Sequence, residues 1–310
     1  MAGFKHQNRR DFLKYFIGTS AVLAGFPAIS REALAKSDLV KLTILYTNDT
    51  HSRIEPFPDN DPKYPNKGGF ARRAAVIDQL RKDNEHVLLL DAGDIFQGTP
   101  YFNMYHGELE YKLMTMMGYD ATTIGNHEFD LGIENIATQM PHAGFAFVNC
   151  NYNFTDTPLH DKIVPYKIFN KGGLKIGVLG IGIELAGLVD KKMYGNTLYS
   201  DPVKSANNTA RLLKQDMGCD YVICLSHIGF KYEDKKISDS TLAPQTENID
   251  LIIGGHTHTF LEHPVKSSNA KGEDIYITQV GWAGIWLGKI DVLFSHNKKK
   301  ITHNSDNRKI

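Results

Sequence analysis

Short apolar runs alternate along the chain with longer amphipathic stretches. Apolar, β-branched runs bounded by Gly, Asn or Asp are typical of buried strands, whereas apolar positions three and four residues apart indicate helices. The pattern predicts buried strands at residues 42–46, 87–90, 121–124, 221–225 and 251–253. It predicts helices at residues 69–81, 108–117, 133–140 and 202–217.

Strand-like segments with no helix between them occur in the second half of the chain. Residues 166–169 and 174–181 are separated by Asn170-Lys171-Gly172-Gly173, which is a hairpin signal. Residues 275–280 and 287–294 predict two more strands, adjacent to one another. Because βαβ units and hairpins occur together, we expect an α/β fold with helices outside and either two sheets or one mixed sheet.

The N-terminal segment has the organisation of an export signal. A basic stretch with paired arginines at residues 8–14 precedes an apolar run at residues 15–29 and a small-x-small cleavage site at residues 33–35. The apolar run is shorter than the roughly 20 residues that a membrane span needs, so we expect no stable membrane anchor. We expect residues 1–35 to be a twin-arginine-type signal peptide and residues 36–310 to be one domain, located in the periplasm or outside the cell.

Composition and charge narrow the class of protein. The chain is 42% hydrophobic and 23% charged, which is ordinary for a globular protein, and its 35 basic residues balance 35 acidic ones. A balanced charge argues against binding to a nucleic-acid polymer, because phosphate contacts need clustered, unpaired Lys and Arg. Three cysteines without a CxxC pair exclude a disulfide framework and a thiolate zinc site.

Polar clusters directly follow five of the predicted strands. They are Asn48-Asp49-Thr50-His51, Asp91-Ala92-Gly93-Asp94, Gly125-Asn126-His127-Glu128, Ser226-His227 and Gly254-Gly255-His256-Thr257-His258. Strand side chains alternate, so we expect Asp49 and His51 to project to the same side. In open α/β sheets, ligands bind beyond the carboxyl ends of the strands. The sequence therefore predicts that these segments bring Asp, His and Asn to one rim.

The residue types at this rim suit a pair of divalent metal ions. Imidazole, carboxylate and amide oxygen without thiolate fit Mn, Zn, Fe(II), Co or Ni. The candidate ligands are Asp49, His51, Asp94, Asn126, His227, His256 and His258. They fill two sites if one carboxylate bridges the ions, and such a centre can clamp a phosphoryl group. A lone Asp-x-His or a lone His is more often a packed or surface residue, but turn glycines beside the ligands strengthen the prediction.

These motifs resemble those of a known family. The series Asp49-x-His51, Gly93-Asp94, Gly125-Asn126-His127-Glu128, His227 and Gly255-His256-x-His258 resembles the calcineurin-like metallophosphoesterase superfamily. Within it, residues 45–51, 91–99 and 125–130 are similar to the N-terminal domain of the 5′-nucleotidase and UDP-sugar hydrolase family, and the likeness covers residues 40–295. The resemblance implies a four-layer α/β/β/α sandwich of two mixed β-sheets flanked by helices.

The resemblance also implies roles for single residues. Asp49, His51 and His258 would hold one ion, Asn126, His227 and His256 the other, and Asp94 would bridge them. His127 would not bind metal but would face the scissile group, with Asp130 as its partner on a helix that begins there. This dyad would stabilise transition-state charge or protonate the leaving oxygen. The alternative for Asp130 is that it only caps a helix opening at Leu131. Family members often carry Gln or Asn where His258 stands.

Together with the predicted export signal, the resemblance implies an exported phosphoester hydrolase whose nucleophile is a hydroxide between two ions. We expect a 5′-nucleotidase-type phosphatase acting on nucleotides or small phosphomonoesters; the alternatives are a broad or cyclic-nucleotide phosphodiesterase and a non-catalytic metal-binding subunit of a split nucleotidase. Full-length family members continue into a C-terminal nucleotide-recognition domain, so this chain either uses its own loops or a separately encoded recognition chain. Candidate substrate contacts are Asn126, Tyr101 and Phe102, the last two because exposed aromatics can stack on bases.

Overall fold

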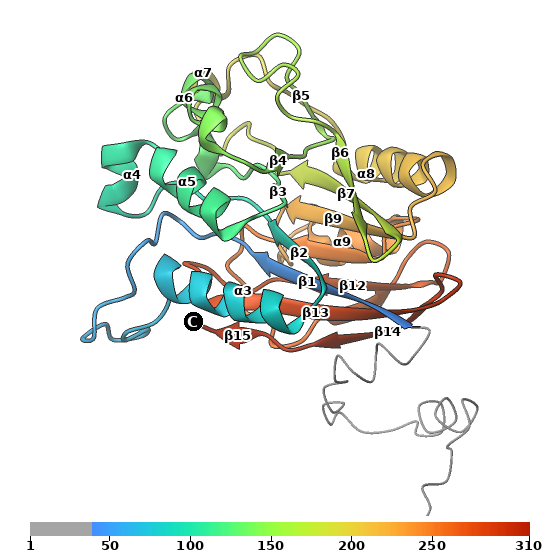
Figure 1. The fold of residues 1–310 in the computed structure, drawn as a ribbon. Helices are drawn as coiled ribbons and strands as arrows, with labels where there is room; N and C mark the ends of the chain where they lie inside the picture. Colours follow the sequence, from blue (N-terminus) through green and yellow to red (C-terminus); the bar gives the residue numbers. More distant parts are fainter. Residues whose placement is uncertain (1–38) are drawn as a thin grey trace, which may run out of the picture. The chain divides into compact units, whose positions relative to one another are not determined.

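The computed structural model describes residues 39–310, which contain two mixed β-sheets with helices on their outer faces (Figure 1). The predicted signal peptide at residues 1–35 lies outside the described residues. Within residues 39–310, no helix combines the length and the apolar character that crossing a membrane requires.

The first sheet is built around four parallel strands. Its order is β14 (Lys300–Ser305), β13 (Trp286–Ser295), β1 (Leu39–Thr47), β2 (His86–Asp91), β3 (Ala121–Thr122) and β4 (Ala146–Phe147), and β15 (Arg308–Lys309) also pairs with β13. Strands β1 to β4 are parallel, while β13 runs antiparallel to β1. The carboxyl ends of the parallel strands therefore meet at one edge of the sheet.

The second sheet has a similar parallel centre. Its order is β11 (Val265–Ser268), β12 (Asp274–Thr278), β10 (Leu251–Gly254), β9 (Tyr221–His227), β7 (Leu174–Gly182) and β6 (Tyr166–Lys171). Strands β12, β10, β9 and β7 are parallel, and antiparallel strands occupy both edges. Two short strands, β5 (Tyr152–Asn153) and β8 (Leu198–Tyr199), form a separate pair.

Three apolar clusters define four layers. Leu88, Val178 and Ile223 belong to a cluster shared by the inner faces of both sheets. Helices α3 (Phe70–Asp83), α4 (Pro100–Tyr105), α5 (Glu108–Met117) and α6 (Ile133–Gln139) pack on the outer face of the first sheet. Helices α8 (Pro202–Arg211) and α9 (Asp239–Leu242) pack on the second. The short helix α7 (Lys191–Tyr194) follows β7. The α/β/β/α sandwich is confirmed.

Several element predictions need correction. Strand β3 contains only Ala121 and Thr122, and the helix predicted over residues 202–217 ends at Arg211, where a π-helical turn at Leu212–Asp216 follows. The strands predicted at residues 275–280 and 287–294 are not neighbours: β12 pairs with β10, whereas β13 pairs with β1 in the other sheet. The polar edge strands β14 and β15 lack the apolar alternation that would have predicted them.

Candidate metal centre

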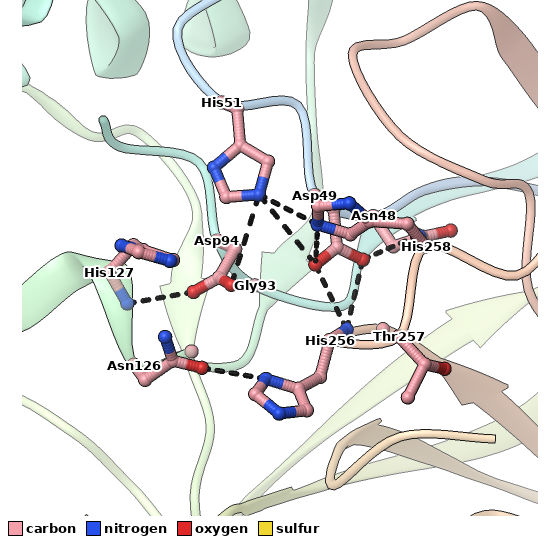
Figure 2. Close-up of polar contacts among 12 residues, drawn as sticks. Asn48, Asp49, His51, Gly93, Asp94, Asn126, His127, His256, Thr257 and His258 are labelled. Carbon is pink, nitrogen blue, oxygen red and sulfur yellow. Dashed lines mark hydrogen bonds and ion pairs between the residues drawn. The ribbon is translucent and has the colours of Figure 1, made fainter. Parts of the chain in front are cut away.

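All seven predicted ligands lie together at the carboxyl ends of strands from both sheets, and Figure 2 labels six of them, all but His227. The segments that follow β1 and β2 carry Asp49, His51 and Asp94, and the segment that follows β3 carries Asn126. In the second sheet, β9 ends at His227 and the segment after β10 carries His256 and His258. Five chain segments thus converge as the sequence predicts.

Two groups of side chains each have the geometry to hold an ion. In the first group, which is Asp49, His51 and His258, the ligand atoms lie within 4.8 Å of one another. The two histidine Nε2 atoms are 2.9 Å apart, and Asp49 Oδ1 lies 3.4 Å from His258 Nε2. The second group, which is Asp94, His227 and His256, is equally compact.

Asp94 lies between the two groups. Its Oδ2 atom is 3.0 Å from His227 Nε2 in the second group. The same atom is 4.0 Å from His51 Nε2 in the first group (Figure 2). Asn126 adds an amide oxygen to the second group, because its Oδ1 atom is 2.8 Å from His256 Nδ1. This arrangement offers one carboxylate to two neighbouring positions.

The donor atoms fit divalent cations. The Nδ1 atoms of His51 and His227 contact the backbone carbonyls of Phe96 at 3.2 Å and Ala92 at 2.7 Å. Since a carbonyl only accepts, each Nδ1 donates, and in the neutral ring Nε2 carries a lone pair that faces other acceptors. Within residues 39–310, buried His227 Nε2 has no hydrogen-bond partner of good geometry. A cation between these atoms satisfies them all.

A proton could take the place at His227 Nε2 that a metal ion would occupy. Burial opposes protonation, but the nearby Asp94 carboxylate outweighs burial and raises the pKa of His227 to about 10. A metal ion therefore competes with a proton at this position, as expected for a site whose ligands must lose protons on binding.

Asp49 and His51 face the same position, as predicted, but an unusual backbone rather than strand alternation is the reason. Strand β1 ends at Thr47, so Asp49 and His51 lie beyond it, with φ values of 49° and 46°. Asp94, His256 and His258 also have positive φ, at 56°, 72° and 53°. Residues other than glycine rarely adopt this left-handed conformation, and each instance costs about 1–3 kcal/mol. The surrounding fold therefore imposes the orientation of five ligands.

Gly93 and Gly125 permit the close approach of two loops. Gly93 has a φ of 88°, and a Cβ atom there would lie 2.7 Å from the backbone nitrogen of Gly125. A Cβ atom at Gly125 would lie 2.2 Å from Asp94 Oδ1. Any larger residue at Gly125 would therefore displace the carboxylate that lies between the two groups.

His127 and Asp130 form a contacting pair beside the two groups. His127 Nδ1 lies 2.9 Å from Asp130 Oδ2, and this contact raises the pKa of His127 to about 9. The backbone N–H of His127 donates to Asp94 Oδ1 at 2.8 Å. His127 begins a single 3₁₀ turn, η1 (His127–Phe129), and Asp130 is the C-cap residue of that turn, so the pair does not lie on an α-helix. Asp130 does not cap a helix opening at Leu131, because α6 starts at Ile133 and is preceded by Gly132.

Comparison with known proteins decides the family. The model of the calcineurin-like phosphoesterase family matches residues 42–260. The chain belongs to this family. Among relatives, the snake venom 5′-nucleotidase of Gloydius brevicauda is 33% identical over an alignment of 288 residues that covers 86% of this chain and 47% of the relative. The chain thus spans about half the length of the curated relatives it first matches.

Solved structures agree with this assignment. The structure of a 5′-nucleotidase precursor from Thermus thermophilus has a TM-score of 0.79 and 29% identity, covering 87% of this chain and 55% of its own. The structure of the calcineurin-like phosphoesterase YfkN from Bacillus subtilis has a TM-score of 0.72 and 27% identity. The match covers 87% of this chain and 91% of the YfkN chain. The predicted family is confirmed.

Glu128 connects two loops of the candidate metal centre by hydrogen bonds, a role that its place in the sequence did not predict. Its buried carboxylate accepts backbone N–H groups from Ile95 at 2.6 Å and Phe96 at 3.3 Å on one oxygen. The other oxygen accepts from Asp94 at 3.0 Å and Gly125 at 2.6 Å. Burial, with the Asp94 charge, raises the pKa of Glu128 to about 7. The signal available in the sequence was an acidic residue directly after the Gly-Asn-His turn.

The aromatic residues predicted to contact substrate behave differently from one another. Phe102 is only 3% exposed and packs against Phe96, with 5.2 Å between the ring centroids, so its ring belongs to the core and is not available to stack on a base. This corrects the prediction for Phe102. Tyr101 is half-buried, and its hydroxyl donates to Glu55 at 3.1 Å.

Proposed function

We propose that the chain is an exported two-metal phosphatase of the 5′-nucleotidase type that acts on nucleotides or small phosphomonoesters. The position of Asp94 between two groups of ligands carries this proposal, because a shared carboxylate is what a two-ion phosphoryl-transfer centre needs. The 5′-nucleotidases among the relatives support the choice of substrate class.

The ligands divide between two ions in this proposal. Asp49, His51 and His258 hold one ion, and Asn126, His227 and His256 hold the other. Asp94 bridges them. Two divalent ions supply an activated water and charge stabilisation for the phosphoryl oxygens.

His127 acts as the proton donor to the leaving oxygen. Asp130 occupies Nδ1 and raises the pKa of His127 to about 9, so the imidazole carries a transferable proton on Nε2 at neutral pH. The His127 and His51 rings are 5.2 Å apart, which keeps the donor beside the first group. Asn126, which directly precedes His127 in the sequence, can contact both an ion and the phosphoryl group. The intact pair argues against a non-catalytic subunit, which would have no use for it.

Nucleotide recognition and location complete the proposal. We propose that loops of this chain, including Tyr101, or a separately encoded recognition chain contact the nucleoside. Removal of the segment at residues 1–35 during export would place the enzyme in the periplasm or outside the cell.

A substrate panel tests the proposal. The metal-loaded chain is assayed on AMP, UDP-glucose, a cyclic nucleotide and bis-p-nitrophenyl phosphate, alone and with any recognition chain encoded next to it. We expect AMP to be cleaved with the highest kcat/KM. Preference for the diesters would favour the phosphodiesterase alternative, and metal binding without hydrolysis of any ester would favour the subunit alternative.

A further inference from the structure

His258 lacks the support that other candidate ligands have. His51 and His227 are each oriented by a carbonyl contact at Nδ1. Among residues 39–310, no hydrogen bond forms at His258 Nδ1, and its side chain is 40% exposed. Its backbone is also in the left-handed region, with φ at 53°. Metal-binding histidines almost always have a second contact that fixes the ring, so something else has to orient this one.

Trp282 supplies that contact. Its ring is parallel to the His258 ring within 6°, with 5.6 Å between centroids, which is an offset stack. The indole is held in turn by edge-on contacts to Phe57 at 5.7 Å and Tyr64 at 6.2 Å. Packing against these two rings therefore sets the position of the indole.

The loop that carries Trp282 is tied to both segments of the first group. The backbone N–H of Ala283 donates to the carbonyl of Asp49 at 2.7 Å. The backbone N–H of Gly281 donates to the carbonyl of Thr259, next to His258, at 2.9 Å. Asn48 strengthens the link, because its side chain accepts from Val280 N–H at 2.9 Å and donates to Gly281 O at 2.6 Å. The indole is thus fixed relative to Asp49 and His258 at once.

We propose that Trp282 is a positioning residue that orients His258 for metal binding in the first group, in place of a hydrogen bond. The inference rests on the proposed two-metal function. A stack fixes the plane of the imidazole but leaves its tautomer free, whereas a carbonyl contact fixes both. The first group therefore binds its metal ion more weakly than the second group does. Its affinity for the ion depends on the indole of Trp282.

Cobalt titration of the full-length protein tests this proposal. The metal-free protein is titrated with Co²⁺ by calorimetry, and wild type is expected to bind two ions in two steps. Trp282→Leu should weaken the weaker step roughly 10-fold and leave the tighter step unchanged, and Trp282→Phe should retain part of the affinity. Trp286→Leu is the matched control, because Trp286 contacts Phe260 at 4.9 Å and not a ligand histidine.

Fluorescence gives a second readout that does not depend on activity. The chain has two tryptophans, so each Phe variant leaves a single reporter. Co²⁺ should quench Trp282 in the Trp286→Phe variant far more than Trp286 in the Trp282→Phe variant. Equal quenching, unchanged binding steps in Trp282→Leu, or equal losses in Trp282→Leu and Trp286→Leu would overturn the proposal. If wild type binds no ion, the proposed function itself fails along with this inference.

Discussion

Replacement of Glu128 by Gln tests how the two loops of the candidate centre are held together. The carboxylate accepts four backbone N–H groups, two on each oxygen. Glutamine has the same size but a single acceptor oxygen, so its amide nitrogen would face two buried N–H groups. Each buried donor left without an acceptor costs about 1–3 kcal/mol, which gives a loss of roughly 2–6 kcal/mol.

Urea unfolding of the metal-free protein, followed by circular dichroism, measures this loss. The expected result is a lower midpoint with an unchanged slope, and weaker metal binding because Asp94 lies on one of the loops that Glu128 holds. Glu134→Gln is the control, because Glu134 is exposed on α6 and its replacement should change the free energy of unfolding by less than about 0.5 kcal/mol. A Glu128→Gln variant within about 1 kcal/mol of wild type would refute the reasoning.

Three further changes have defined outcomes. His127→Ala should lower kcat by a factor of roughly 10²–10⁴, while native mass spectrometry should still detect two bound ions. A loss of ions would contradict the role of His127 as proton donor. Gly125→Ala should lower the metal content, because its Cβ would lie 2.2 Å from Asp94 Oδ1; retention of two ions at wild-type affinity would contradict this. Burial lowers the pKa of His303 to about 4, so the contribution of His303 to stability should be complete above about pH 6.5 and should fall by up to about 3 kcal/mol as the pH drops to 4, since the unfolded chain binds that proton first. His303→Phe should flatten this dependence in urea melts at several pH values, and an unchanged slope would contradict it.

The ligands could be predicted because their signal is local. A glycine turn, an Asp, Asn or His and a preceding apolar strand stand within a few residues of one another in each motif, as in Gly125-Asn126 after β3. The parallel strands then place these turns at one rim whatever the details of the loops. The four-layer arrangement followed from the alternation of strands and helices together with the family resemblance.

The parts that could not be predicted depend on contacts between distant segments. The left-handed backbone at Asp49 and His258 reflects restraints from other loops, and nothing at these positions in the sequence signals it. The role of Glu128 depends on hydrogen bonds from the backbone of residues 94–96, which are distant from it in the sequence. Phe102 looks like a loop aromatic in sequence but is buried because α4 brings it onto Phe96. The sheet to which β12 and β13 belong is likewise a matter of long-range pairing.

Each group of ligands draws on both layers of strands. Asp49 and His51 come from the first sheet and His258 from the second, while Asp94 comes from the first sheet and His227 and His256 from the second. An ion in either group would therefore link the two sheets to each other. Metal binding and the packing of one sheet against the other would then be thermodynamically coupled. Removal of the ions by a chelator should therefore lower the stability of the whole domain. A mutation that shifts one sheet relative to the other should lower activity even though it changes no ligand.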